Sequence, residues 1–82
     1  MTFHHRTDNF DCEISHDYHW SKYNIRILIS DAGPVSLSVY VGGGEIYEVD
    51  GSRPLTKAEH EFVRSAVNNM GGEYALRSWK KG

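Results

Sequence analysis

Two runs of alternating residues joined by a turn sequence constrain the fold of this chain most. In residues 23–30 and 35–41 every second position is a large apolar side chain, namely Tyr23, Ile25, Ile27, Ile29, Val35, Leu37, Val39 and Val41. This period of two is typical of a β-strand with one buried face. The intervening Asp31-Ala32-Gly33-Pro34 contains residues that favour tight turns. The two runs therefore predict a β-hairpin with one apolar face.

Further extended segments flank this hairpin. Residues 10–15 also alternate between apolar and polar side chains. After Gly42-Gly43-Gly44, residues 45–50 resume an extended pattern, with Ile46 on one face and Tyr47 and Val49 nearer the other. Residues 1–9 are polar and are expected to fray, and residues 16–21 are interpreted as a loop. The pattern predicts an antiparallel β-meander of three to four strands.

The period changes to that of a helix over about residues 57–70. Thr56 and Glu59 have the spacing of a capping box, in which each side chain accepts from a backbone N–H near the start of the helix. Leu55 stands where a hydrophobic staple is expected, and Gly71-Gly72 is typical of a helix end. The predicted apolar stripe consists of Ala58, Phe62, Val63, Ala66, Val67 and Met70. Residues 73–79 fit a short strand or a second helix, and we favour the strand.

These elements predict one small α+β domain spanning residues 1–82, with the order β-β-β-β-α and a possible short C-terminal strand. Leu, Ile, Val and Phe make up only 18 of the 82 residues, so the core should be thin. The helix is expected to cover one face of the meander. The other face would present polar side chains to water or to a partner.

Composition and charge narrow the functional classes. No apolar run is long enough to cross a membrane, and the single cysteine allows no internal disulfide framework, so a cytoplasmic protein is expected. Residues 1–52 contain eight acidic and three basic side chains, whereas residues 53–82 contain six basic and three acidic ones. This asymmetry could steer a charged partner. The alternative is a solvated surface with chance clustering.

Catalytic and metal chemistry are not supported by the motifs. Cys12, His4, His5, His16 and His19 could ligate zinc, but their spacing is irregular. Cys12 alternates with Phe10 and Ile14 and lies between acidic neighbours, which favours a core residue over a nucleophile. Glu45 follows the triple glycine, which favours a hairpin tip over a phosphate loop. We therefore predict no enzyme activity, no cofactor and no metal site.

Ten aromatic residues in so short a chain favour protein–protein binding instead. The function predicted is an inhibitor or regulator of a larger partner protein, a role that small acidic single-domain chains, including those encoded by phages, often have. The partner could present a basic groove. The residues expected to contact it are Tyr18, Trp20, Tyr40, Glu45, Tyr47 and Glu48.

Two alternatives remain open from the sequence. The basic C-terminal third could bind nucleic acid through phosphate contacts, using Arg53, Lys57, Arg64, Arg77, Lys80 and Lys81. A homodimer could also form through an exposed strand edge, because Pro34 protects only one end of its strand.

Overall fold

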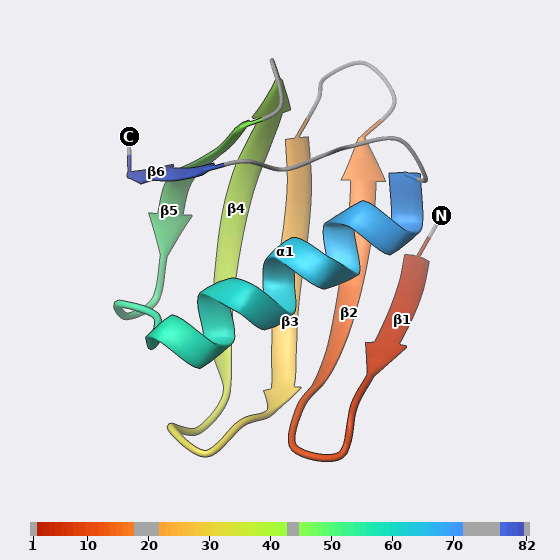
Figure 1. Cartoon of the computed structure of the whole chain (residues 1–82), viewed down its shortest axis with the longest axis vertical. Coiled ribbons are helices and arrows are strands. Elements are labelled where there is room, and N and C mark those ends of the chain that lie inside the picture. Colours follow the sequence, from red (N-terminus) through yellow and green to blue (C-terminus); the bar gives the residue numbers. More distant parts are fainter. Residues whose placement is uncertain (1, 18–21, 43–44, 72–77, 82) are drawn as a thin grey trace.

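The computed structural model describes residues 2–17, 22–42, 45–71 and 78–81 (Figure 1). These residues form six strands and one helix. In chain order they are β1 (Thr2–Arg6), β2 (Asp11–Asp17), β3 (Lys22–Ile29), β4 (Val35–Gly42), β5 (Glu45–Gly51), α1 (Lys57–Gly71) and β6 (Ser78–Lys81).

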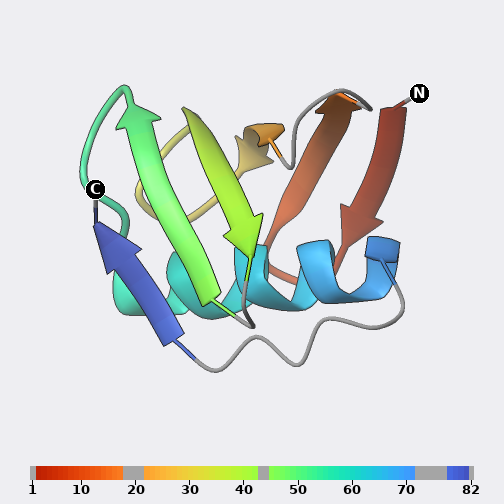
Figure 2. The ribbon, with the colours of Figure 1, turned by 90° about the horizontal axis from the view of Figure 1, so that it is seen from above.

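The strands form one sheet in which spatial order follows chain order. Strands β1 to β5 pair antiparallel, and β6 pairs with β5 in parallel. Between β5 and β6 the chain passes through α1, which lies diagonally across one face of the sheet (Figures 1 and 2). The molecule therefore has two layers, and the helix covers only one side of the sheet.

The predicted meander is confirmed in outline, although the sheet is larger than expected. Five antiparallel strands replace the predicted three to four. Residues 1–9 were expected to fray, which is wrong for Thr2–Arg6, because these residues form β1 against β2. Phe3 packs against the core, and the ring of His5 lies 5.3 Å from the ring of Phe62 on α1. These two contacts with the protein interior hold β1 in the sheet.

The C-terminal strand also exists, but it is shorter than the predicted segment. Ser78–Lys81 forms β6, and its register places Ser78 opposite Glu45 and Lys81 opposite Glu48. Residues 73–77 of the predicted segment lie outside the described residues. The parallel pairing requires the helical crossover, since no hairpin can join neighbouring parallel strands.

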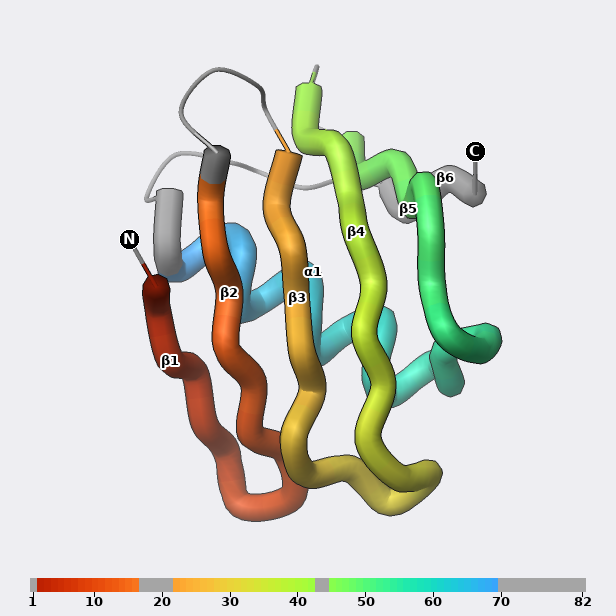
Figure 3. The backbone as a smooth tube through the Cα atoms, turned by 180° about the vertical axis from the view of Figure 1, so that it is seen from behind, coloured from red at the N-terminus to blue at the C-terminus, as the bar shows by residue number. Residues whose placement is uncertain are grey.

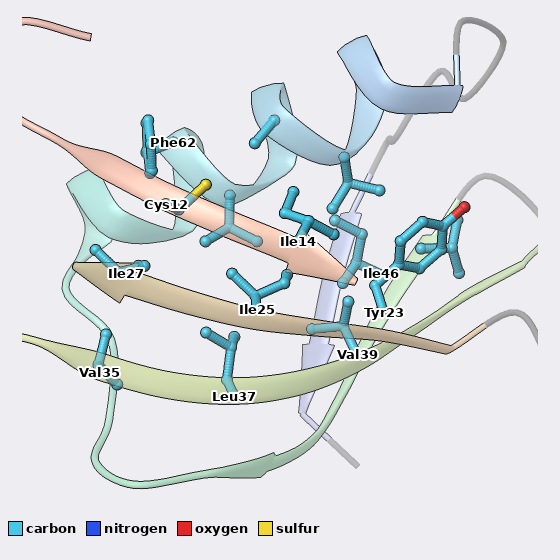
Figure 4. Close-up of a cluster of buried hydrophobic side chains, with 14 residues drawn as sticks. Cys12, Ile14, Tyr23, Ile25, Ile27, Val35, Leu37, Val39, Ile46 and Phe62 are labelled. Carbon is cyan, nitrogen blue, oxygen red and sulfur yellow. The ribbon is translucent and has the colours of Figure 1, made fainter. Parts of the chain in front are cut away.

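The core lies between the helix and the inner face of the sheet (Figure 4). Its buried side chains are Cys12, Ile14, Tyr23, Ile25, Ile27, Val35, Leu37, Val39, Val41, Ile46, Phe62, Val63, Ala66 and Val67. The prediction that Cys12 is a core residue is confirmed. Burial raises the pKa of its thiol to about 11, so the unreactive protonated form dominates at neutral pH.

One predicted core residue is on the wrong face. Ile29 was expected to continue the apolar face of β3, but 52% of it is exposed. The pairing of β2 with β3 contains a register shift, because Asp11 lies opposite Ile29 while the next residue, Cys12, lies opposite Ile27. The extra residue on β3 reverses the alternation of faces at this end of the strand.

Helix α1 begins as the capping box predicts. The Glu59 backbone N–H donates to Thr56 Oγ1 (3.2 Å), and the Thr56 backbone N–H donates to Glu59 Oε1 (2.9 Å). Leu55 packs against the core, as the staple position implies. Ala58 was expected in the apolar stripe but is exposed, and Glu59 is buried in its place. The side chain of Met70 lies outside the described set.

An ion pair explains how a carboxylate is accommodated in this interior. Arg53 donates to both carboxylate oxygens of Glu59 at 2.8 and 2.6 Å, and Ser30 Oγ donates to Oε2 at 2.6 Å. Arg53 also donates to the backbone carbonyl of Gly33. These bonds connect the β3–β4 turn to the start of α1. They also lower the pKa of Glu59 to about 2, with the Arg53 hydrogen bonds as the main cause.

Among the described residues, α1 is the one helix, and it lacks the length and apolar character that a membrane span requires.

Candidate functional site

No described element covers the face of the sheet opposite α1 (Figure 3). Strand alternation directs the polar residues of β3 and β4 to this open face. The cross-strand register sets Asn24 opposite Ser38 and Arg26 opposite Ser36. Ser38 Oγ donates to Asn24 Oδ1 at 2.9 Å. Where β3 and β4 pair, the open face therefore presents polar side chains.

Two tyrosines lie side by side on this face. Tyr40 on β4 is directly opposite Tyr47 on β5, and the two residues are 37% and 38% exposed. The Tyr47 hydroxyl donates to Glu45 Oε2 at 2.5 Å. This hydrogen bond to a carboxylate raises the pKa of Tyr47. It also fixes the position of the Tyr47 ring relative to the sheet.

Val49 is a third exposed apolar side chain near the tyrosines, and it lies at a β-bulge. Ser38 pairs with Asp50 and Val39 pairs with Glu48, which leaves Val49 as the extra residue on β5. Val49 is 49% exposed. Tyr40, Tyr47 and Val49 are three of the four large apolar residues that are exposed in the described part of the chain. We call Tyr40, Glu45, Tyr47 and Val49 the β4–β5 patch.

A shallow groove of about 440 Å³ lies next to this patch. Its polar lining consists of Asn24, Arg26, Ser36, Ser38, Asp50 and Ser52. Two hydrogen bonds connect Ser52 to Ser36 across the groove lining. Ser52 Oγ accepts from the Ser36 backbone N–H at 3.1 Å, and the Ser52 N–H donates to the Ser36 carbonyl at 2.9 Å. The described lining contains no pairing of a nucleophile with a general base, and its chemistry suits hydrogen-bonded recognition.

Glu48 was predicted to be a contact residue, but its side chain is not on the open face. It is 6% exposed, because its pairing with Val39 places it on the inner face of β5, on the same side as Ile46. Residues 45 and 48 differ by an odd number of positions, and side chains in a strand alternate between faces. This parity was visible in the sequence and separates Glu48 from Glu45.

The structure brings together three of the six predicted contact residues, Tyr40, Glu45 and Tyr47. Tyr18 and Trp20 lie outside the described residues. Sequence reasoning assigned Val49 to the outer side of its strand but missed it as a contact residue. Its exposure follows from the alternation that buries Ile46 and Glu48 and exposes Tyr47, so the sequence pattern contained this signal.

The histidines and Cys12 are dispersed in the structure. His4 Nε2 lies 3.1 Å from Glu13 Oε1 on the open face, whereas the ring of His16 stacks on Tyr23 with 4.4 Å between centroids. Cys12 is buried in the core. The described residues contain no group of three or more potential metal ligands, and His19 lies outside them.

The basic residues of the C-terminal third do not form one described surface. The guanidinium of Arg53 donates hydrogen bonds to Glu59 and to two backbone carbonyls. Lys57 is exposed at the start of α1, and Arg64 is partly buried, with its Nε lacking a partner. The side chains of Arg77, Lys80 and Lys81 lie outside the described set.

Comparison of the chain with protein-family models, curated proteins and solved structures finds no match. The surface of the protein itself is therefore the basis on which a function is proposed.

Proposed function

We propose that this chain is a small protein-binding module that inhibits or regulates a larger partner, and that it contacts the partner through the β4–β5 patch. The observation that carries the proposal is the clustering of Tyr40, Tyr47 and Val49 on two neighbouring strands of an uncovered face. Contiguous exposed apolar groups mark interaction sites. Tyrosine is enriched among the residues that contribute most to binding energy.

The rigidity of the patch supports this function. Both tyrosines project from paired strands, and the Tyr47 hydroxyl is held by Glu45. The loss of side-chain entropy on binding is smaller for a side chain that is already ordered. A preorganised aromatic pair can therefore contribute most of its contact energy to affinity.

The charge of the patch favours a basic partner surface. Glu45 is the first residue of β5 and bonds to Tyr47 of the tyrosine pair. Asp50 lines the adjacent groove. Residues 1–52, which include all of β1 to β5, contain eight acidic and three basic side chains. Complementary charge accelerates association and discriminates against acidic partners.

The test is affinity capture compared across matched variants. The tagged wild type, a Tyr40→Ser/Tyr47→Ser double variant and Glu61→Gln, a control on the exposed side of α1, are incubated with lysate from the source cell. Quantitative mass spectrometry then compares the bound proteins. We expect one partner to be retained by the wild type and by Glu61→Gln, and to bind the double variant at least tenfold more weakly when the purified proteins are titrated.

Two results with the same variants would contradict the proposal. A partner that binds the double variant as tightly as the wild type uses another surface, which contradicts this assignment. Retention of DNA or RNA with a steep loss of affinity between low and moderate salt would replace protein binding with the nucleic-acid alternative. In that case the tyrosine pair could stack on bases, as aromatic pairs on neighbouring strands do in some RNA-binding sheets.

A further inference from the structure

The two edge strands of the sheet differ in how well they are protected from pairing with another chain. β6, at one edge, has four residues and ends in two lysines, and a short strand with lysines is a common form of protection. β1, at the other edge, contains neither Lys nor Pro, and its register with β2 runs without a bulge. No described element lies beyond the outer side of β1 (Figures 1 and 2). β1 is therefore the unprotected edge.

The sequence left open a homodimer through the edge of the strand that follows Pro34. That strand is β4, which pairs with β3 on one side and with β5 on the other, so the expectation of a free edge there is wrong. Within the described part of the chain, the strand edge open to another molecule is that of β1.

The register of β1 shows which of its backbone groups point outward. The Thr7 N–H donates to the Phe10 carbonyl at 2.9 Å, so these two residues are a hydrogen-bonded pair of the antiparallel ladder. Hydrogen-bonded and non-hydrogen-bonded pairs alternate along such a ladder. Phe3 and His5 therefore direct their N–H and C=O groups toward β2. The residues that direct these groups away from β2 are Thr2, His4 and Arg6.

We propose that β1 pairs antiparallel with β1 of a second copy of this chain, about a two-fold axis at His4. This register sets Thr2 opposite Arg6, and His4 opposite His4 of the other copy. Every outward N–H then meets an outward carbonyl, as a hydrogen-bonded ladder requires. The two sheets become one continuous sheet with both helices on the same face, and the two-fold axis closes the dimer.

A pocket beside β1 favours a second copy of the chain over an unrelated strand. It measures about 150 Å³, lies between β1 and the second half of α1, and is lined by Phe3, His4, His5, Ile14, Ala66 and Asn69. An apolar cavity of about this volume accepts one benzene ring. The proposed register sets Phe3 of the second copy opposite His5, on the face of the sheet that α1 covers. Each copy therefore brings one aromatic ring of suitable size to the pocket of the other.

The charges of β1 are compatible with this pairing. Arg6 faces Thr2 across the proposed axis rather than a second arginine. His4 Nε2 lies 3.1 Å from Glu13 Oε1 on β2, so the imidazole contacts its own chain while the His4 backbone stays open to the outer side. Like charges directly opposite each other destabilise a sheet, and in this register no two lysines, arginines or carboxylates meet.

Sedimentation of the full chain over a range of concentrations tests the proposal, and we expect a reversible equilibrium between monomer and dimer. His4→Pro removes an outward N–H that the pairing of β1 with β2 does not use, so it should weaken the dimer at least tenfold. His4→Ala is the matched control. It removes the side chain but keeps the N–H, so its dimer should be nearly as stable as that of the wild type.

Exposed Thr2 reports the register without altering the backbone. Thr2→Glu sets a carboxylate opposite Arg6 of the second copy and should tighten the dimer several-fold at low salt. Thr2→Lys sets a like charge there and should weaken it by a similar factor. Equal effects of the two variants would overturn the register, whether or not His4→Pro folds.

Amide hydrogen exchange shows whether the edge itself is paired. In the dimer the His4 and Arg6 amides should exchange slowly, and on dilution to the monomer they should exchange fast. The Phe3 and His5 amides, which face β2, should keep their protection better. A chain that stays monomeric at its highest soluble concentration overturns the proposal, as does a dimer with fast exchange at His4 and Arg6. Protection of these two amides only on binding a different protein would assign the edge to a partner strand and overturn self-pairing.

The inference is independent of the proposed function, because β2 and β3 separate β1 from the β4–β5 patch. Tyr40→Ser/Tyr47→Ser should therefore dimerise like the wild type. Loss of the dimer in that variant would place the contact between copies at the patch and overturn the assignment to β1.

Discussion

Two buried glutamates show how differently the same side chain can be used in one small protein. Glu59 satisfies the start of α1, pairs with Arg53 and accepts from Ser30. Glu48 lies on the inner face of β5 and keeps 6% of its surface exposed. Removing one partner of a buried ion pair is strongly destabilising, because the remaining charge is left without compensation.

The ion pair of Glu59 predicts a pH dependence of stability. The pKa of Glu59 in the folded protein is lowered from 4.5 to about 2, so the contribution is complete above pH 4.5 and is lost as the pH falls toward 2. At about 1.4 kcal/mol per pH unit, the full loss is roughly 3 kcal/mol. Urea unfolding of the wild type and of Glu59→Gln should show a free-energy difference that shrinks over this range.

Glu61→Gln serves as the control for this measurement, because it removes an exposed glutamate from the same helix. Its unfolding free energy should differ from that of the wild type by less than about 0.5 kcal/mol at every pH. A difference between Glu59→Gln and the wild type that stays constant from pH 6 to pH 2 would contradict the role of the ion pair.

At the scale of elements, the β3–β4 turn depends on a single backbone conformation. Gly33 has a φ of +90°, and its N–H donates to the Ser30 carbonyl at 3.0 Å. A Cβ atom added at Gly33 would meet no atom within 4 Å, so Gly33→Ala changes only the backbone preference. We expect it to lower the free energy of unfolding by about 1–2 kcal/mol, measured by chemical denaturation.

Gly42 provides the matched control for the turn. It too has open space around its Cβ position, but it lies at the end of β4 and its φ is not positive. Gly42→Ala should therefore leave stability within about 0.5 kcal/mol of the wild type. Equal losses for the two variants would mean that the conformation at Gly33 is not what limits the turn.

The elements differ in how far the sequence predicts them. Strands β3 and β4 and helix α1 have strong periodicity and a capping box, and they occur where expected. Strand β1 was missed because its inward residues, Phe3 and His5, do not form a plainly apolar run. The neighbouring position of β5 and β6 depends on the crossover through α1, and no local pattern encodes it.

The β4–β5 patch, too, could be predicted only in part from the sequence. The tyrosines and Glu45 were identified from composition, but their contact across β4 and β5 depends on the strand register. The bulge at Asp11/Cys12 determines which face Ile29 occupies. A single inserted residue reverses every later side chain in a strand, so periodicity alone cannot locate the reversal.

At the scale of the whole molecule, the charge asymmetry follows the architecture. Strands β1 to β5 come from residues 1–52, where acidic side chains outnumber basic ones, and the chain then passes to the helix and the basic C-terminal end. In the proposed complex, the partner would meet an acidic sheet with two tyrosines on its open face. Charge at such a surface acts mainly on the rate of association.

This arrangement predicts the effect of reversing one charge. Glu45→Lys places a positive charge beside Tyr40 and Tyr47 and removes the acceptor of the Tyr47 hydroxyl. With a basic partner, the association rate constant should fall several-fold at low salt, and the difference from the wild type should diminish at high salt. Glu48, the other acidic residue among the predicted contacts, is not changed, because a lysine at that buried position would also disturb folding.

Stopped-flow association with the captured partner at several salt concentrations measures this effect, and Glu61→Lys introduces the same change of charge on the helix as a control. The thermal midpoint of Glu45→Lys should stay close to that of the wild type, because exposed polar contacts contribute little to stability. If Glu61→Lys slows association as much as Glu45→Lys does, net charge alone steers the partner. If neither variant alters the rate at low salt, the partner does not approach the acidic face of the sheet.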